Sequence, residues 1–105
     1  MEITVSGRHL EITPAIRQYA TEKVGKLPRY FDRVQQISII ADKQDNHTFN
    51  VEIIVDAEGH DRFVGRSTGP DLYAGIDACV DKLERQLTDH KEKTRRRMGK
   101  TSMSG

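Results

Sequence analysis

Five residues with cationic or amide side chains recur at helical spacing near the C-terminal end of the chain: Lys82, Arg85, Gln86, Lys93 and Arg96. At roughly 100° per residue they form one stripe on a helix, rotated about a third of a turn from an apolar stripe. Guanidinium and ammonium groups bind phosphate oxygens, and a helix would present them as a rigid row. The spacing therefore predicts binding of a polyphosphate backbone, not catalysis.

Further candidates come from a first helical segment and from the end of the second. Lys23 and Lys26 share one flank of the first segment, and side-by-side packing of the two helices would join both rows into one strip. The alternative is that these residues form solvated faces with i,i+4 ion pairs such as Asp81–Arg85. The candidate RNA-binding residues are Lys23, Lys26, Arg29, Lys82, Arg85, Gln86, His90, Lys93 and Arg96.

No residue pattern predicts catalysis, a metal site or a cofactor. Phosphate-loop and dinucleotide-binding glycine patterns are missing, and Cys79 lies between apolar positions, as a core residue would. The acidic loop at residues 56–61 is explained by turn chemistry. Four histidines are scattered without the close spacing of a zinc site: His9, His47, His60 and His90. Four aromatic residues are expected to pack rather than to stack on bases: Tyr19, Tyr30, Phe31 and Tyr73.

The formal net charge of +1 conceals a strong segregation of charge along the chain. Residues 1–41 contain six Lys or Arg and four Asp or Glu, residues 42–81 contain three and nine, and residues 82–105 contain eight and three. The three blocks therefore carry +2, −6 and +5. A local excess of basic residues in the helical segments indicates a surface for an anionic partner.

The chain has 105 residues, an ordinary length for one domain. Its first residues begin a strand-like alternation rather than a signal peptide, and no apolar run approaches membrane-spanning length. One cysteine excludes an internal disulfide and fits a reducing compartment. We therefore expect a cytoplasmic protein without a membrane partner.

Hydrophobic periodicity predicts strands at residues 2–6, 34–41, 48–57 and 62–67, with a polar turn at residues 42–46. A first helix begins with Thr13 as N-cap and Pro14 at its first position, contains Gly25, and ends at Pro28 or just before it. A second helix follows Asp71. Its apolar stripe consists of Leu72, Ile76, Cys79, Val80, Leu83 and Leu87.

The order β-α-β-β-β-α predicts an α+β fold, a two-layer sandwich in which both helices pack on one face of a four-stranded sheet. Past Leu87 the apolar period stops, so the second helix should extend beyond its core and fray. We predict one domain at residues 1–97, followed by a polar flexible tail at residues 98–105.

Three segments resemble the ribosome hibernation-promoting factor and ribosome-associated inhibitor family, whose members have also been labelled sigma-54 modulation proteins. The second helical segment matches with DLYAGID at residues 71–77, DKLERQL at residues 81–87 and HKEK at residues 90–93. The opening matches with SGRHLEITPAIR at residues 6–17, and the end of the first helix with KLPRYFDRV at residues 26–34. The resemblance runs from about residue 3 to residue 93, in the family's order.

The resemblance implies a fold similar to that of double-stranded RNA-binding domains, and binding to the small ribosomal subunit, its rRNA and the intact ribosome. Family members lie in the mRNA–tRNA channel and hold ribosomes inactive under stress or in stationary phase. The resemblance thus implies a ribosomal partner contacted through basic helix surfaces, and no small-molecule substrate. Whether a second factor is needed for ribosome dimerisation stays open.

Two departures from the family pattern shape this expectation. Asp89 interrupts the cationic row where relatives often carry a basic residue, and the chain ends without the second domain of longer members. We therefore expect a short form that keeps single ribosomes inactive. The alternative function is a protein–protein regulator of the sigma-54 modulation type, whose acidic sheet and loop region at residues 42–61 binds a basic partner.

Overall fold

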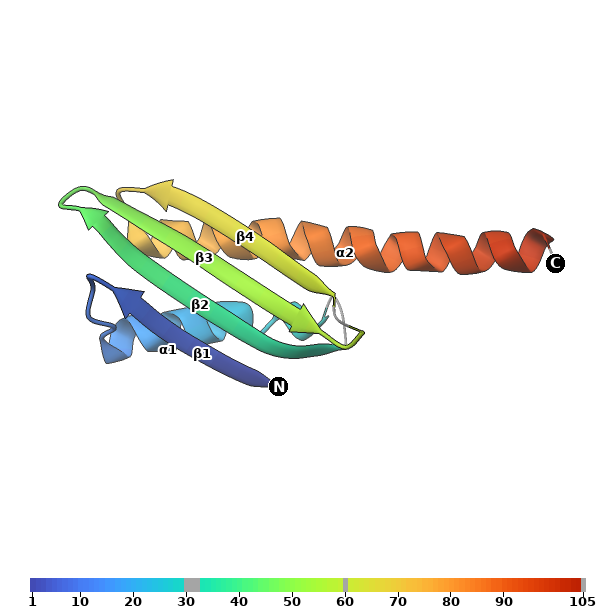
Figure 1. Cartoon of the computed structure of the whole chain (residues 1–105), viewed down its shortest axis with the longest axis horizontal. Helices are drawn as coiled ribbons and strands as arrows, with labels where there is room; N and C mark the ends of the chain where they lie inside the picture. The colour runs from blue at the N-terminus through green and yellow to red at the C-terminus, as the bar shows by residue number, and fades with distance from the viewer. Residues whose placement is uncertain (30–32, 60, 105) are drawn as a thin grey trace.

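The computed structural model describes the backbone at residues 1–29, 33–59 and 61–104, and side chains within these ranges as far as His90. The elements in chain order are β1 (Glu2–Arg8), α1 (Pro14–Val24), the short 3₁₀ helix η1 (Leu27–Arg29), β2 (Val34–Asp45), β3 (Thr48–Ala57), β4 (Arg62–Gly69) and α2 (Leu72–Ser104). The predicted order β-α-β-β-β-α is confirmed (Figure 1).

The described strands form one sheet in the order β1-β2-β3-β4. β1 and β2 are parallel, with Ile3 opposite Ile37, whereas the β2–β3 and β3–β4 pairs are antiparallel. A parallel pair needs a crossover connection, and α1 provides it. Both helices lie on the same face of the sheet (Figure 1), which confirms the predicted two-layer sandwich.

The core lies between the helices and the sheet. The whole predicted apolar stripe of α2 is buried, with exposures of 6% or less. Burial of a large aliphatic side chain contributes about 1.5–3 kcal/mol, so this layer decides which flanks of the helices remain available to partners. The other buried residues of the cluster are Ile16, Ala20, Val24, Leu27, Val34, Ile37, Ile39, Ala41, Val51, Ile53 and Val55.

The first helix begins as predicted but ends earlier. Thr13 Oγ1 accepts a hydrogen bond from the Ile16 N–H at 3.2 Å, and Pro14 occupies the first turn. Gly25 is the C-cap, not an interior residue, and its N–H donates to the Thr21 carbonyl. The chain then continues into the 3₁₀ helix η1, and Leu27 of this helix is fully buried in the core. The prediction that this helix contains Gly25 and ends at Pro28 or just before it was wrong for α1, which ends at Val24.

β2 is longer than its hydrophobic pattern indicates. It continues through the segment expected to be a turn, and Asp42 and Lys43 pair with Asn50 and Phe49 of β3. The antiparallel partner satisfies the backbone groups there, so pairing outweighs the polar composition. The side chain of Asp45 accepts a hydrogen bond from the His47 N–H at 2.8 Å, which closes the hairpin.

α2 packs tightly on the sheet because β4 has a glycine beneath it. A Cβ atom at Gly65 would lie 2.8 Å from the Cys79 carbonyl oxygen and 3.2 Å from Leu83 Cγ. Cys79 is fully buried, with its Sγ 3.4 Å from both the Val51 carbonyl oxygen and Ser67 Oγ. Burial raises the pKa of its thiol. The prediction that Cys79 is a core residue is confirmed.

α2 extends well beyond the sheet (Figure 1): among its described side chains the last buried one is Leu87, and the helix continues to Ser104. The predicted domain boundary at residue 97 and the flexibility of the tail stay predictions. In the part of the chain that the structure describes, no helix is long and apolar enough to cross a membrane.

Candidate nucleic-acid interface

The polar side chains between α1 and α2 form what we call the α1–α2 seam: Lys23, Lys26, Asp77, Asp81 and Glu84. Lys23 Nζ lies 3.4 Å from Asp77 Oδ1, and Lys26 Nζ lies 3.6 Å from Glu84 Oε1. Asp81 lines the same hollow as both lysines. Two predicted RNA-binding residues are therefore each paired with a carboxylate of α2.

Tyr19 completes the arrangement around Asp77. Its hydroxyl donates a hydrogen bond to Asp77 Oδ1 at 2.7 Å, and Lys23 Nζ lies 5.4 Å from the centre of its ring. The Asp77 carboxylate raises the pKa of Lys23 by stabilising the ammonium. It also raises the pKa of Tyr19, chiefly because the hydrogen bond requires the neutral phenol. Lys23 is therefore cationic at neutral pH.

The opposite flank of α2 lies beside the edge strand β4. Lys82 Nζ donates to the Arg66 carbonyl oxygen, and Gln86 Nε2 donates to the Val64 carbonyl oxygen at 2.9 Å. An edge strand leaves backbone groups unpaired, and polar side chains that reach them help to prevent pairing with another chain. Lys82 and Gln86 thus have a structural role that the sequence did not indicate.

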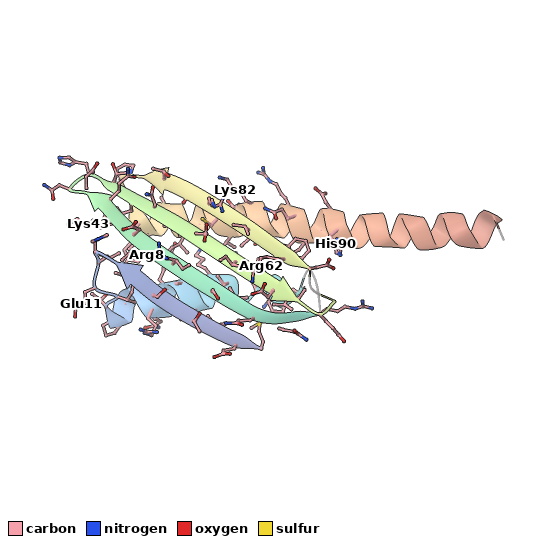
Figure 2. All side chains as sticks on the ribbon, in the orientation of Figure 1. Arg8, Glu11, Lys43, Arg62, Lys82 and His90 are labelled. Atoms are coloured by element: carbon pink, nitrogen blue, oxygen red, sulfur yellow. The ribbon has the colours of Figure 1, made fainter. Side chains whose placement is uncertain are left out.

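His90 continues this flank of α2 (Figure 2). Its Nε2 lies 3.3 Å from Asp61 Oδ2, and its ring meets the Phe63 ring edge-on, with centroids 5.2 Å apart. The predicted hydrogen-bonding residue is therefore partly engaged by the β3–β4 loop and by β4.

Arg29 and Arg85 are predicted contacts on the surface of the helical layer, and Arg85 lines a shallow hollow with Glu84, Thr88 and Asp89. Both are exposed, Arg29 on η1 and Arg85 on α2. Among the described residues neither forms an ion pair, so the i,i+4 pair of Arg85 with Asp81 is not formed. The side chains of Lys93 and Arg96 lie outside the described residues, although both positions belong to α2.

Among the described side chains, Lys82, Gln86 and His90 do not join Lys23 and Lys26 in the expected single strip. Lys82, Gln86 and His90 reach the β4 side of α2, whereas Lys23 and Lys26 lie across its other flank. The reason is the helical period: Asp77, Asp81 and Glu84 follow i, i+4, i+7 and turn a separate acidic row toward α1. That spacing was visible in the sequence, but its lysine partners were not.

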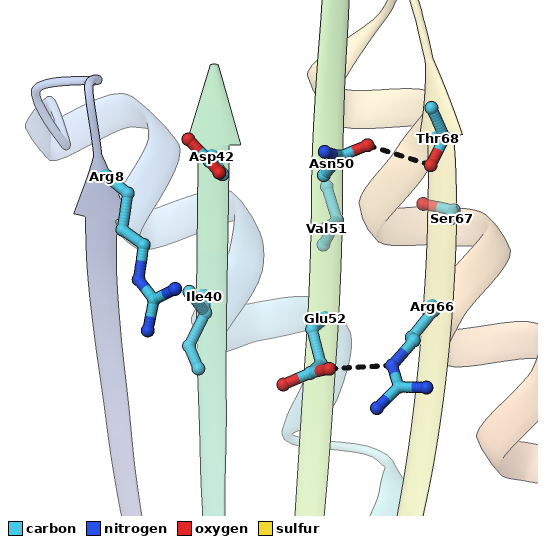
Figure 3. Close-up of a pocket in the computed structure, with 9 residues that line it drawn as sticks. All are labelled: Arg8, Ile40, Asp42, Asn50, Val51, Glu52, Arg66, Ser67 and Thr68. Carbon is cyan, nitrogen blue, oxygen red and sulfur yellow. Dashed lines mark hydrogen bonds and ion pairs between the residues drawn. The ribbon is translucent and has the colours of Figure 1, made fainter. Parts of the chain in front are cut away.

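The uncovered face of the sheet carries its own ion pairs. Glu52 accepts a hydrogen bond from Arg66 Nε and Asp56 from Arg62 Nε, both at 2.7 Å, and His9 lies 3.1 Å from Asp42. Figure 3 shows the hollow between the strands of this face, where Asn50 also accepts a hydrogen bond from Thr68 at 2.8 Å. The hollow is lined by Arg8, Ile40, Asp42, Asn50, Val51, Glu52, Arg66, Ser67 and Thr68.

No group of three or more His, Cys, Asp or Glu suited to a metal ion occurs among the described residues. His60 of the acidic loop lies outside them, as do Tyr30 and Phe31.

Tyr19 packs against the core, as expected, and meets the ring of Tyr73 edge-on at 4.8 Å. Tyr73 is 39% exposed.

Comparison with known sequences identifies relatives over most of the chain. Residues 3–95 match the family described as Sigma 54 modulation protein / S30EA ribosomal protein. A protein named ribosome hibernation promoting factor from Klebsiella oxytoca is 40% identical over 96 residues, a match that covers 89% of this chain and 96% of that protein. The Escherichia coli (strain K12) protein of the same name is 38% identical over 93 residues, with the same coverage.

Solved structures agree with this assignment. The Protein Y N-terminal domain of Thermus thermophilus is 36% identical with a TM-score of 0.76, over 86% of this chain and 99% of that one. A ribosomal subunit interface protein from Coxiella burnetii is 26% identical with a TM-score of 0.79, over 88% of this chain and 99% of that one. The resemblance found in the sequence is therefore confirmed, and the chain belongs to the hibernation-promoting factor family, described as Sigma 54 modulation protein / S30EA ribosomal protein.

Proposed function

We propose that this protein binds the small ribosomal subunit in the mRNA–tRNA channel and holds ribosomes inactive under stress or in stationary phase. Family membership supports the ribosome as partner, since relatives are named ribosome hibernation promoting factor and ribosomal subunit interface protein. The protein would act in the cytoplasm by occupying space, without substrate turnover.

The observation that carries this proposal is that two predicted RNA contacts on the helical layer are exposed and unpaired among the described residues. On the helical layer Arg29 and Arg85 are exposed and form no ion pair with described residues. On the sheet face Arg62 and Arg66 are held by carboxylates at 2.7 Å, although Arg8 there forms no ion pair with described residues. Unpaired guanidinium groups bind phosphate at less cost than groups that must first leave a partner. We therefore assign the rRNA contact to the helical layer.

The geometry supports binding by many weak contacts rather than by one pocket. α2 is a long helix whose exposed positions carry Lys82 and Arg85, and its extension adds Lys93 and Arg96 by sequence. Each phosphate neutralised by such a residue releases a counterion, so affinity should fall with salt with a slope of about 0.9 per contact. A channel lined by rRNA would suit such a surface, and its occupation would exclude mRNA and tRNA.

The test compares two matched double variants in sedimentation with small subunits and with whole ribosomes through sucrose gradients over a salt series. Arg29→Gln with Arg85→Gln removes two charges from the helical layer, and Arg62→Gln with Arg66→Gln removes two from the sheet face. We expect the first pair to weaken binding roughly tenfold, at about 0.5–1 kcal/mol per exposed contact. The second pair should bind like the wild type.

Charge reversal at Lys82 would be a less clear test, because Lys82 also contacts the edge of β4. Equal binding by both double variants and the wild type would contradict the site assignment. Wild-type protein that stays at the top of the gradient at low salt would contradict ribosome binding itself. A peak of paired ribosomes in the same gradients would add a pairing role, with or without a second factor.

A second candidate function is regulation of a protein partner, since the family description includes sigma-54 modulation. It would use the acidic region at residues 42–61. The carboxylates of Asp42, Glu52 and Asp56 are already paired within the molecule, which weakens their attraction for a basic partner. Under this function the Arg62 and Arg66 double variant, not the helical one, would change binding to a basic partner.

A further inference from the structure

The α1–α2 seam has more negative than positive charge, although two of its residues are predicted RNA contacts. Lys23 and Lys26 contribute two positive charges, and Asp77, Asp81 and Glu84 contribute three negative ones. A phosphate that approaches either lysine meets a carboxylate at the same ammonium group. The seam of the free protein is thus not a ready site for RNA.

We propose that Asp77 and Glu84 compete with RNA phosphate for Lys23 and Lys26, and so set the strength and salt dependence of RNA binding. The inference rests on the function proposed above, which it deepens by assigning a role to two acidic residues. The carboxylates occupy the position that a phosphate oxygen takes in the complex.

The two pairs are loose enough to exchange partners. Their N–O distances of 3.4 and 3.6 Å exceed the 2.7 Å of the arginine pairs on the sheet face. The lysine side chains of these pairs are 37% and 40% exposed. Ion pairs that are exposed to this degree contribute little to stability, so a phosphate competes with them readily.

When phosphate replaces the carboxylate, Lys23 moves rather than Asp77, because Asp77 has a second hydrogen-bond partner. The Tyr19 hydroxyl holds the Asp77 carboxylate at 2.7 Å, whereas Lys23 has a flexible stem. When RNA binds, the ammonium turns toward phosphate and the carboxylate stays in place. The remaining carboxylate then repels the nearby phosphate, which reduces affinity.

The test uses Asp77→Asn and Glu84→Gln, which keep the shape of each side chain and remove its charge. In the Asp77→Asn variant the amide oxygen can still accept the hydrogen bond from the Tyr19 hydroxyl. We expect each variant to bind small subunits about threefold more tightly and the double variant about tenfold, consistent with the value of exposed charge interactions. The slope of log affinity against log salt should steepen by about 0.9 for each lysine released.

Glu52→Gln is the matched control, since it removes one carboxylate that holds a cation, but on the sheet face. It changes net charge equally and should leave affinity unchanged. A double-mutant cycle tests whether Asp77 acts through Lys23. In a Lys23→Met background, Asp77→Asn should bring no further gain in affinity for small subunits. A gain that persists without Lys23, or equals that of Glu52→Gln, would show only a general charge effect and overturn the proposal.

The same variants are measured with a short RNA duplex by fluorescence anisotropy at low salt. If the wild type binds ribosomes but neither variant gains affinity, the competition is refuted and ribosome binding stands. If the wild type does not bind ribosomes, the proposed function fails, and the duplex measurement still decides the competition. Equal duplex affinities of wild type and variants would then refute it.

Discussion

At the scale of single residues, Asp77 of α2 contacts two side chains of α1. It accepts the Tyr19 hydroxyl and pairs with the Lys23 ammonium, and Tyr19 in turn meets Tyr73. The pKa values of Tyr19 and Lys23 are both raised, since the carboxylate favours the protonated form of each. The polar contacts of the cluster are therefore strongest while both donors keep their protons.

We predict that Asp77→Asn lowers the free energy of unfolding near neutral pH, and that this difference shrinks in alkali. A raised pKa in the folded state adds stability below the ordinary values, 10.0 for Tyr19 and 10.5 for Lys23. That stability is lost as the pH rises through the folded-state values. Urea unfolding of wild type and variant near pH 7 and at about pH 11 measures it. A difference that is independent of pH would contradict the prediction.

At the scale of elements, α2 protects the edge of β4 as well as covering the core. Lys82 and Gln86 lie one helical turn apart, so both reach carbonyl oxygens of the same strand, at Arg66 and Val64. These contacts use the flank of α2 that also carries predicted RNA contacts. The same side chains therefore serve the fold and, in our proposal, lie next to the bound RNA.

We expect Lys82→Met with Gln86→Met to lower the free energy of unfolding by about 1–2 kcal/mol, since each lost hydrogen bond is worth roughly 1 kcal/mol. The exposed strand edge should also promote self-association. Denaturant unfolding and sedimentation velocity at increasing concentration measure the two effects. Arg85→Met is the control on the exposed side of α2, and a variant pair as stable as this control would disprove the role.

At the scale of the whole molecule, the sheet and the helical layer have different roles. The sheet supplies one wall of the core and the helices cover that wall. α2 continues to Ser104, past Leu87, the last buried residue among its described side chains. The 58 Å length of the molecule follows from this projection (Figure 1). A helix segment that extends past the sheet contributes little to stability, and in our proposal its basic residues contact the ribosome.

We predict that a chain ending at Glu92 folds as stably as the full chain but binds ribosomes more weakly and with a shallower salt dependence. The deletion removes five Lys or Arg and no Asp or Glu. Thermal unfolding and gradient sedimentation test the two parts. A chain ending at Arg97 is the control for the predicted domain boundary, and should match the full chain in both. Loss of folding in the shorter chain would refute the separation of core and extension.

Much of the fold was predictable because its signals are local. The stripe from Leu72 to Leu87 repeats at the helical period, and Thr13-Pro14 begins a helix by its own hydrogen-bonding chemistry. The boundaries of β2 and α1 were less predictable. Asp42 and Lys43 belong to β2 because β3 pairs with them. Gly25 ends α1, and Leu27, two residues later, is buried in the core.

The sequence by itself determined the element order, the inward residues and the family, because periodicity, capping and motifs are properties of neighbouring residues. Only the tertiary structure decided the partners of the polar side chains. Lys23 meets Asp77, and Lys82 meets a β4 carbonyl, because packing rotates each helix until its apolar stripe is buried. That rotation directs one flank of α2 to the edge strand and the other to α1. The order of charged residues along the sequence does not predict this rotation.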